Sequence, residues 1–337
     1  MTDLHVLLTL PFSTSQLERL QAVSPRLKFH AYPTRNPDTI PGEVLAEAEV
    51  LYTLTTLPEP RHMPNLKWIQ FHFAGIDHAV DHPLLEHAEK VTTLSGAGVP
   101  QLSEYVLMAI LSLGHRLHSI MRASPEDQWS QDRNKRFAPL ELRGSTVGII
   151  GYGSIGRDIA RLVSAFGAEV LATKRNLRQL EDKGYQLEGL GDPKADIPRR
   201  LYPPEALGSM VSECDFVVVT VPLTEQTRGL VGERIFNAMK KSAYLIDISR
   251  GGVVDQDALL KALSDEDLAG AVLDVFPEEP LSPESPLWKS EKIILTPHIS
   301  GNSPHYLARA TDLFAENLRR YVTDESLINE YKTRRGY

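Results

Sequence analysis

Short apolar runs alternate with helix-like segments through the first hundred residues of the chain. This alternation is typical of a parallel sheet whose strands are joined by helices. A capping-box pattern, Ser15-x-x-Glu18, precedes one predicted helix, and Pro41–Ala48 is predicted to be another. These residues therefore predict a doubly wound domain without a glycine-rich phosphate loop. Its predicted strands are His5–Leu10, Lys28–Tyr32, Val50–Leu54, Leu66–Phe71 and Val91–Leu94.

A second series of strand-like runs predicts a full dinucleotide-binding sheet, which needs about six parallel strands with helices between them. A mostly apolar helix, Ser103–Leu117, precedes this series, and a last helix, Pro304–Tyr321, is expected to return and cover the first domain. The connection Arg175–Pro204 is long and polar, and long connections of this kind are often functional. The predicted strands are Thr146–Ile150, Glu169–Thr173, Phe216–Thr220, Tyr244–Ile248, Ala271–Val275 and Lys292–Thr296.

The first strand of that series runs directly into a three-glycine motif, Gly151-x-Gly153-x-x-Gly156. In a dinucleotide fingerprint the first glycine allows the tight turn, the second lets a pyrophosphate approach, and the third lets the helix pack on the strand. A helical pattern follows and ends at Gly167, so its N-terminal amides would face the phosphates. The apolar face of that helix is predicted to hold Ile155, Ile159, Leu162, Val163 and Phe166.

The end of the second strand indicates which dinucleotide is bound. NAD sites usually place an acidic residue there to accept from the ribose 2′-hydroxyl, whereas this strand is followed by Lys174 and Arg175. Cations suit a 2′-phosphate, and a hydrogen bond to a charged group is worth about 1.5–3 kcal/mol, which is a preference of about 10- to 150-fold. We therefore predict NADP over NAD; the alternative is a solvated basic surface loop.

Composition narrows the class of protein. The chain has 337 residues, enough for about two domains, and its net charge of −8 argues against a nucleic-acid partner. The single cysteine, Cys214, excludes an internal disulfide and a cysteine-based zinc cluster, and no metal is expected. Val6–Leu10 is too short for a signal peptide, and no apolar run approaches the ~20 residues that span a bilayer. A cytoplasmic protein without a membrane partner is expected.

Four further segments carry a resemblance to a known family. They are Val221–Thr224, Leu245–Asp255, Gly270–Leu281 and Thr296–Gly301, and each lies at or beyond the carboxyl end of a predicted strand. With the glycine loop, these motifs resemble the D-isomer-specific 2-hydroxyacid dehydrogenase family, including glyoxylate/hydroxypyruvate reductases. The resemblance implies an α/β fold of two doubly wound parallel-sheet domains. A Rossmann dinucleotide-binding domain, 103–300, would be inserted in a flavodoxin-like substrate-binding domain, 1–102 and 301–337.

The resemblance also implies the catalytic residues. Arg250 would bind the carboxylate and carbonyl of a 2-oxoacid, for which its planar, permanently charged fork is suited. His298 would be the acid/base, and Glu279 would pair with it and favour the imidazolium form that donates a proton. Glu278 is adjacent, but the spacing from Asp274 and the following proline favour Glu279.

The remaining site residues are also implied by the resemblance. The segment Phe73–Asp77 follows a predicted strand, and the residues Ala74, Gly75 and Ile76 would complete the substrate site with Arg250 and His298; the alternative for this segment is an ordinary strand–helix turn. Asp274 would hold the nicotinamide carboxamide. The full set expected to contact the cofactor is Gly151, Gly153, Ser154, Ile155, Gly156, Lys174, Arg175, Val221, Pro222, Thr227, Ile248, Ser249, Asp274, His298 and Gly301.

The function expected from these residues is hydride transfer between NADP(H) and a small 2-oxoacid or D-2-hydroxyacid, with glyoxylate or hydroxypyruvate reduction favoured. A homodimer is implied by the resemblance, with Ser103–Leu117 and the arm after it as the candidate contact. Two alternatives stay open. One keeps the fold and changes the substrate to phosphoglycerate, phosphite or formate. The other is a dinucleotide-sensing protein that resembles a transcriptional co-repressor. Many family members carry Asn where this chain has Asp247.

Overall fold

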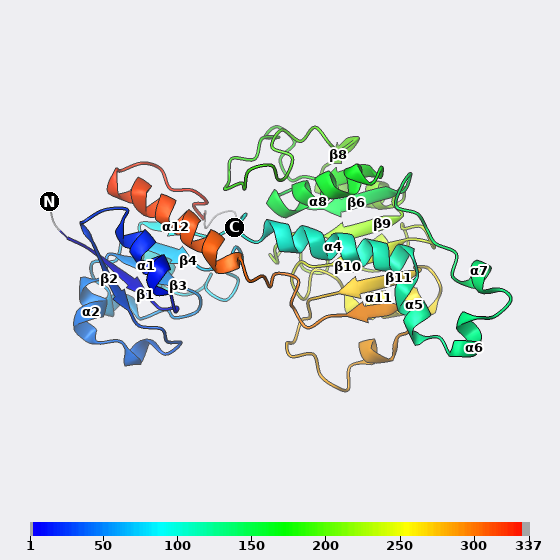
Figure 1. The fold of residues 1–337 in the computed structure, drawn as a ribbon, viewed down its shortest axis with the longest axis horizontal. Coiled ribbons are helices and arrows are strands. Elements are labelled where there is room, and N and C mark those ends of the chain that lie inside the picture. The colour runs from blue at the N-terminus through cyan, green and yellow to red at the C-terminus, as the bar shows by residue number, and fades with distance from the viewer. Residues whose placement is uncertain (1–2, 332–337) are drawn as a thin grey trace. The chain divides into compact units, whose positions relative to one another are not determined.

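The computed structural model describes residues 3–331, and these form two compact units (Figure 1). The described residues of the ranges 1–98, 184–187 and 303–337 make the first unit, and those of 99–183 and 188–302 make the second. No helix among the described residues is long and apolar enough to cross a bilayer.

The first unit is built on a five-stranded parallel sheet in the order β2-β1-β3-β4-β5. Both faces of this sheet are buried, with apolar residues of α1 and α12 on one face and those of α2 and α3 on the other. The strands are β1 Leu4–Leu8, β2 Leu27–Ala31, β3 Val50–Thr53, β4 Trp68–Phe71 and β5 Lys90–Thr92, and the helices are α1 Thr14–Gln21, η1 Pro37–Thr39, α2 Gly42–Glu47, η2 Pro60–His62, α3 Leu84–His87 and α12 Tyr306–Val322.

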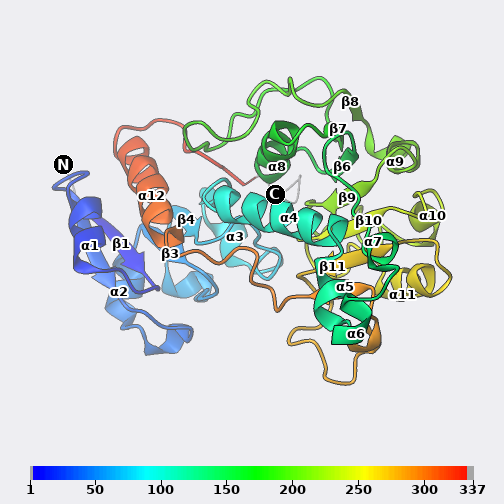
Figure 2. The same ribbon diagram turned by 45° about the vertical axis from the view of Figure 1, so that its right-hand side comes forward.

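The second unit holds a seven-stranded parallel sheet in the order β12-β11-β10-β9-β6-β7-β8, with α4 and α8 packed together on one face (Figure 2). Its strands are β6 Thr146–Ile150, β7 Glu169–Thr173, β8 Arg200–Tyr202, β9 Phe216–Val219, β10 Tyr244–Asp247, β11 Gly270–Leu273 and β12 Ile293–Leu295. Its helices are α4 Val99–Gly114, α5 Leu117–Arg122, α6 Pro125–Gln128, α7 Arg133–Arg136, α8 Ser154–Ala165, η3 Pro204–Ala206, α9 Leu207–Val211, α10 Glu233–Phe236, α11 Gln256–Ser264 and η4 Pro286–Lys289.

The fold class expected from the sequence is confirmed, because both sheets are parallel and doubly wound. The expected return of the last helix is also found. Leu313, Phe314 and Leu318 of α12 are fully buried in the first unit. A long helix could not otherwise bury its apolar stripe after the second sheet is complete.

Three local predictions are wrong. The capping box of α1 is formed by Ser13 and Gln16, not by Ser15 and Glu18, because the chain turns helical two residues earlier. The second sheet has a seventh strand, β8, in addition to the six predicted; it lies inside the long, polar connection Arg175–Pro204 and pairs with β7. Phe166 is 43% exposed rather than on the buried face of α8, because that helix ends at Phe166 and turns at Gly167, where φ is +87°.

Candidate active site

The glycine motif has the geometry that a dinucleotide fingerprint requires. Gly151 has φ +105°, and a Cβ there would lie 2.8 Å from Val221 Cγ1. A Cβ at Gly156 would overlap the carbonyl oxygen of Gly151, whereas a Cβ at Gly153 would meet nothing within 4 Å. Two glycines are therefore needed for packing, and the third leaves an open approach to the backbone.

The N-terminus of α8 is prepared for an anion. Its N-cap is Gly153, which has no side chain to cap the first-turn amides. Those N–H groups and the positive end of the helix dipole favour a phosphate at this position. Thr173 at the end of β7 accepts from the Gly151 N–H (3.0 Å), which fixes the start of the loop. The residues present therefore fit the pyrophosphate of a dinucleotide.

The basic residues predicted to hold a 2′-phosphate follow β7 directly. Lys174 is half-buried, and its Nζ donates to the Tyr152 carbonyl oxygen (3.5 Å). Burial and the neighbouring Arg157 lower the pKa of Lys174. Arg175 is exposed. Both cations thus stand at the strand end where the ribose of a bound dinucleotide is expected.

A buried polar cluster holds the Arg175–Pro204 connection against the start of α8. Arg157 is 2% exposed, donates to the carbonyl oxygens of Asp192 and Leu180, and lies 5.0 Å from the centre of the Tyr152 ring. The Asp192 carboxylate accepts from Tyr152 Oη (2.6 Å) and from the backbone amide of Ile197 (3.0 Å). The apolar periodicity of the sequence does not predict this cluster, because charged residues on a helix normally face water. The one sequence signal is that two charged residues, Arg157 and Asp158, follow the glycine motif directly.

The same connection brings a carboxylate to the phosphate loop. Ser154 Oγ donates to Asp182 Oδ2 (3.3 Å), and Arg157 Nε lies 3.8 Å from the same oxygen. Asp182 is 15% exposed. The Asp182 carboxylate therefore contacts Ser154 at the start of α8, a residue that the sequence analysis expects to contact the cofactor.

A histidine–carboxylate pair lies beyond the ends of β11 and β12. His298 Nδ1 lies 2.7 Å from Glu279 Oε2, and the two side chains are 44% and 35% exposed. The other oxygen, Glu279 Oε1, accepts from the Phe276 amide (3.0 Å), which fixes the carboxylate. Because Glu279 engages Nδ1, a proton exchanged with a substrate would be carried by Nε2 of His298.

Asp274 fixes the backbone that carries His298. Its side chain is fully buried and accepts from the amides of Ile299 (2.9 Å) and Ser300 (2.8 Å) and from Thr296 Oγ1 (2.6 Å). His298 has φ +53°, an uncommon conformation for a residue with a side chain. Three hydrogen bonds to one carboxylate therefore hold the histidine in a strained turn. Tyr105 Oη, which the sequence did not single out, lies 2.5 Å from Thr296 Oγ1.

Arg250 follows β10 in a turn that two other residues shape. Arg250 Nη1 donates to the Ser249 carbonyl oxygen (2.8 Å), and the guanidinium is partly exposed. A Cβ at Gly251 would overlap the Phe276 carbonyl oxygen, so the Arg250 and Glu279 loops approach as closely as backbone allows. The structure thereby brings Arg250, Glu279 and His298 to neighbouring strand ends of one sheet.

The other predicted cofactor residues lie in the same unit. Val221, Pro222 and Thr227 belong to the turn after β9, where Thr227 Oγ1 donates to the Pro222 carbonyl oxygen (2.6 Å). Ile248 is buried at the end of β10, and the Gly301 carbonyl oxygen accepts from Gln101 (2.9 Å). The predicted substrate residues Ala74, Gly75 and Ile76 follow β4 in the first unit, with Ile76 buried and the other two partly or fully exposed.

Among residues 3–331, one group could offer a metal three ligand atoms within 4.8 Å of one another: His5, His30 and Glu47. It lies in the first unit, and the two rings are stacked and hydrogen-bonded through Nδ1 of His5 and Nε2 of His30 (3.0 Å). This group is not part of the constellation around His298.

Comparisons with known proteins show which family this chain resembles. Residues 107–300 match the model of the D-isomer specific 2-hydroxyacid dehydrogenase, NAD binding domain. A glyoxylate reductase from Thermofilum pendens is 34% identical over 271 residues, covering 79% of this chain and 76% of the relative. An (S)-sulfolactate dehydrogenase from Chromohalobacter salexigens is 31% identical over 257 residues, covering 76% and 78%.

A solved structure resembles the whole chain. The D-isomer specific 2-hydroxyacid dehydrogenase from Xanthobacter autotrophicus Py2, crystallised with NADPH and MES, has a TM-score of 0.79 and 27% identity, and the match covers all of both chains. The paired His298 and Glu279, the nearby Arg250 and the glycine loop stand in the part of the chain that the family model matches. The chain belongs to the D-isomer specific 2-hydroxyacid dehydrogenase family and is an NAD(P)-dependent 2-hydroxyacid dehydrogenase.

Proposed function

We propose that this protein reduces a small 2-oxoacid, such as glyoxylate or hydroxypyruvate, to the D-2-hydroxyacid with NADPH. The observation that carries the proposal is the His298–Glu279 pair at 2.7 Å, with Arg250 in the neighbouring turn. The relatives are named for different substrates, one as a glyoxylate reductase and the other as an (S)-sulfolactate dehydrogenase. Their names therefore support the type of reaction but do not favour one particular acid.

The chain's own residues account for binding and proton transfer. Arg250 binds the carboxylate and carbonyl oxygen of the 2-oxoacid through its planar fork. His298 donates the Nε2 proton to the carbonyl oxygen, and Glu279 stabilises the imidazolium before the transfer. A bound nicotinamide dinucleotide supplies the hydride that reaches C2. The carbonyl thus gains one hydride and one proton and becomes an alcohol, and His298 is left neutral.

The predicted sites divide between the two units. Ala74, Gly75 and Ile76 would bind the substrate carboxylate from a substrate-binding domain, 1–102 and 301–337, and the Rossmann domain, 103–300, would bind the dinucleotide. Asp274 is proposed to contact the nicotinamide carboxamide in addition to holding the His298 loop.

The preference for NADPH is supported by Lys174 and Arg175 at the end of β7 and by the NADPH bound in the Xanthobacter relative. The negative charge of Asp182, beside Ser154, disfavours a phosphate at the start of α8. This repulsion must be separated by experiment from the attraction that Lys174 and Arg175 exert on a 2′-phosphate. Replacing both cations, K174A/R175A, should raise the KM for NADPH at least about tenfold and leave the KM for NADH within about twofold.

Side-by-side steady-state oxidation of NADPH and NADH tests the proposal, with glyoxylate, hydroxypyruvate and phenylpyruvate as acceptors. We expect NADPH to be favoured at least about tenfold with one of the two smaller acids. A preference for NADH would refute the cofactor assignment alone. Consumption of neither cofactor with any 2-oxoacid would refute the reaction and favour another substrate or a sensing role.

A cytoplasmic homodimer is the proposed state of the protein. Large apolar side chains are exposed along α4, α5 and the segment after them: Met108 is 49% exposed, Leu117 47%, Met121 76% and Trp129 77%. Large apolar side chains exposed on successive elements are a common feature of interfaces. Light scattering should give a dimer for the native chain, and M121E should shift the population toward monomer.

A further inference from the structure

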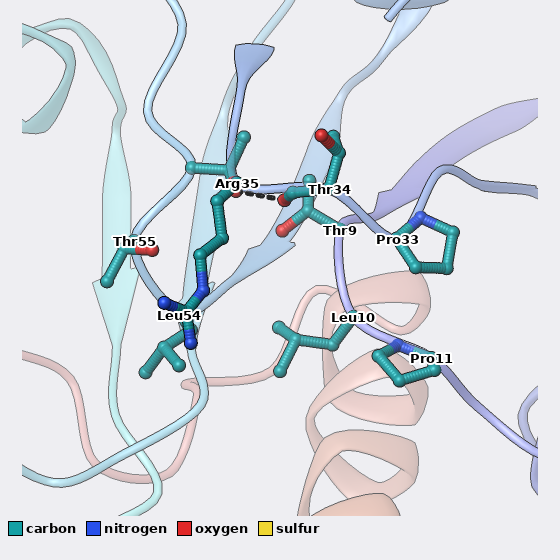
Figure 3. Close-up of a pocket in the computed structure, with 9 residues that line it drawn as sticks. Thr9, Leu10, Pro11, Pro33, Thr34, Arg35, Leu54 and Thr55 are labelled. Carbon is teal, nitrogen blue, oxygen red and sulfur yellow. Dashed lines mark hydrogen bonds between the residues drawn. The ribbon is translucent and has the colours of Figure 1, made fainter. Parts of the chain in front are cut away.

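The first unit has a pocket at the point where the strand order of its sheet reverses. This pocket is separate from the group formed by Arg250, Glu279 and His298. The pocket has a volume of about 390 Å³ (Figure 3). In a sheet of order 2-1-3-4-5, ligands bind beyond the carboxyl ends of the first and third strands. The connections that follow these two strands run to opposite faces of the sheet and leave a crevice between them. Its lining comes from the segments that follow β1, β2 and β3, namely Thr9–Pro11, Pro33–Arg35 and Leu54–Thr56.

The walls of the pocket are fixed by hydrogen bonds among its own residues. Thr56 Oγ1 donates to the Thr34 carbonyl oxygen (2.5 Å), which ties the segment after β3 to the segment after β2. Thr9 Oγ1 donates to Thr53 Oγ1 (3.0 Å), which ties the ends of β1 and β3. A ligand therefore meets a wall that is already ordered, and ordering it costs little binding free energy.

One cation is directed at this pocket. Arg35 is the only charged residue in the lining, and Figure 3 shows its side chain extending toward Leu54 and Thr55. Within residues 3–331, the Arg35 side chain forms no ion pair and no hydrogen bond, and neither does the Thr55 hydroxyl. A guanidinium and a hydroxyl without protein partners, on a preformed wall, are suited to an oxyanion.

The pocket lies beside the segment proposed to bind the substrate carboxylate. β3 and β4 are paired neighbours, and His78 Nε2, just after that segment, lies 2.8 Å from the Leu54 carbonyl oxygen. Because β3 and β4 are adjacent parallel strands, the pocket and the segment that holds Gly75 follow neighbouring strands at the same edge of the sheet. One short acid could therefore reach both places only if it carried an anionic group at each end.

We propose that this pocket binds a second anionic group of the substrate, so that a 2-oxoacid with a distal carboxylate, sulfonate or phosphate is reduced in preference to an acid of the same length without one. The inference rests on the proposed 2-oxoacid reduction and names the substrate class of that reaction. Arg35 is a specificity-determining residue in this view, and it takes no part in proton or hydride transfer.

Pairs of acids that differ only in the distal group test the inference. Oxaloacetate is compared with 2-oxobutyrate, and 2-oxoglutarate with 2-oxovalerate, by kcat/KM with saturating cofactor. We expect the native protein to favour the dianion in at least one pair by about tenfold or more, chiefly through KM. R35Q should reduce that ratio about tenfold, and R35K should retain part of it, because a lysine keeps the charge and loses the planar fork.

The matched control is R61Q, which removes an exposed arginine of the same unit outside the pocket lining and should keep the native ratio. Equal ratios in the native protein and R35Q, with both acids turned over, overturn the inference and leave the proposed reaction intact. No turnover of these acids while glyoxylate or hydroxypyruvate is reduced overturns the inference alone, and no turnover of any 2-oxoacid refutes the reaction and the inference with it. Inhibition by inorganic sulfate that disappears in R35Q while the substrate ratio stays unchanged would assign the pocket to a free anion and also overturn the inference.

Discussion

The carboxylate of Asp247 makes the stability of the second unit depend on pH. Asp247 ends β10, is 1% exposed, and accepts through Oδ1 from Ser249 N (2.9 Å) and Ser249 Oγ (2.5 Å). Burial raises its pKa from 3.8 to about 7, the nearby Asp274 adds to the rise, and the Ser249 bonds oppose it. D247N should remove this dependence, since an amide keeps an oxygen for Ser249 and never ionises.

The size of the effect follows from the two pKa values. Each tenfold change in proton affinity is worth about 1.4 kcal/mol, so a pKa raised from 3.8 to about 7 corresponds to on the order of 4 kcal/mol. The folded protein binds this proton more tightly than the unfolded chain. The stabilisation is therefore complete below pH 3.8 and is lost as the pH rises to about 7. Between pH 5 and pH 8 the native protein should lose about 3 kcal/mol that D247N does not lose.

Unfolding of both proteins by urea and by heat at pH 5 and pH 8 measures this loss. The contributions of all other titrating groups to the pH dependence are the same in both proteins and cancel in the comparison. We expect the stability of D247N relative to the native protein to increase by about 3 kcal/mol from pH 5 to pH 8, or about 6–12 °C in Tm for a unit of this size. E278Q, which removes an exposed carboxylate of the same unit, should show no such increase. A constant difference between the native protein and D247N would refute the reasoning.

Three further substitutions test the site. E279Q should lower kcat for reduction by about 10- to 100-fold, because His298 loses the carboxylate that pairs with its Nδ1. D274N should destabilise the second unit by about 1–3 kcal/mol and lower kcat/KM, because its amide nitrogen would face a backbone donor in the His298 turn. D182N should tighten the binding of both NADPH and NADH several-fold in a fluorescence titration, because it removes a negative charge beside Ser154.

Two neighbouring carboxylates serve as controls for those substitutions. E278Q changes the same charge as E279Q at a position outside the His298 pair, and E181Q does so beside Asp182; both residues are exposed. If E278Q slowed reduction as much as E279Q does, the pairing argument would fail. If E181Q tightened cofactor binding as much as D182N does, the effect would be one of net charge and not of the contact with Ser154.

The sequence by itself determined the architecture, the family and the class of enzyme. Strands β6 and β7 begin and end where the apolar runs predict, because buried parallel strands are continuously hydrophobic. The glycine motif is readable because only glycine tolerates φ +105° at Gly151 and the close contact at Gly156. Arg250 and His298 were singled out by the family resemblance, and their motifs follow strand ends, which a parallel sheet brings to one edge.

Only the tertiary structure decided how the long connection is used. Arg157 and Asp192 are buried although their sequence context is polar, because each is satisfied by a partner tens of residues away. The approach of Asp182 to Ser154 and the ordered pocket around Arg35 likewise depend on contacts between segments that no local pattern links. Periodicity reports which residues avoid water, but a buried charge is stable only when distant partners are placed around it, and the fold alone places them.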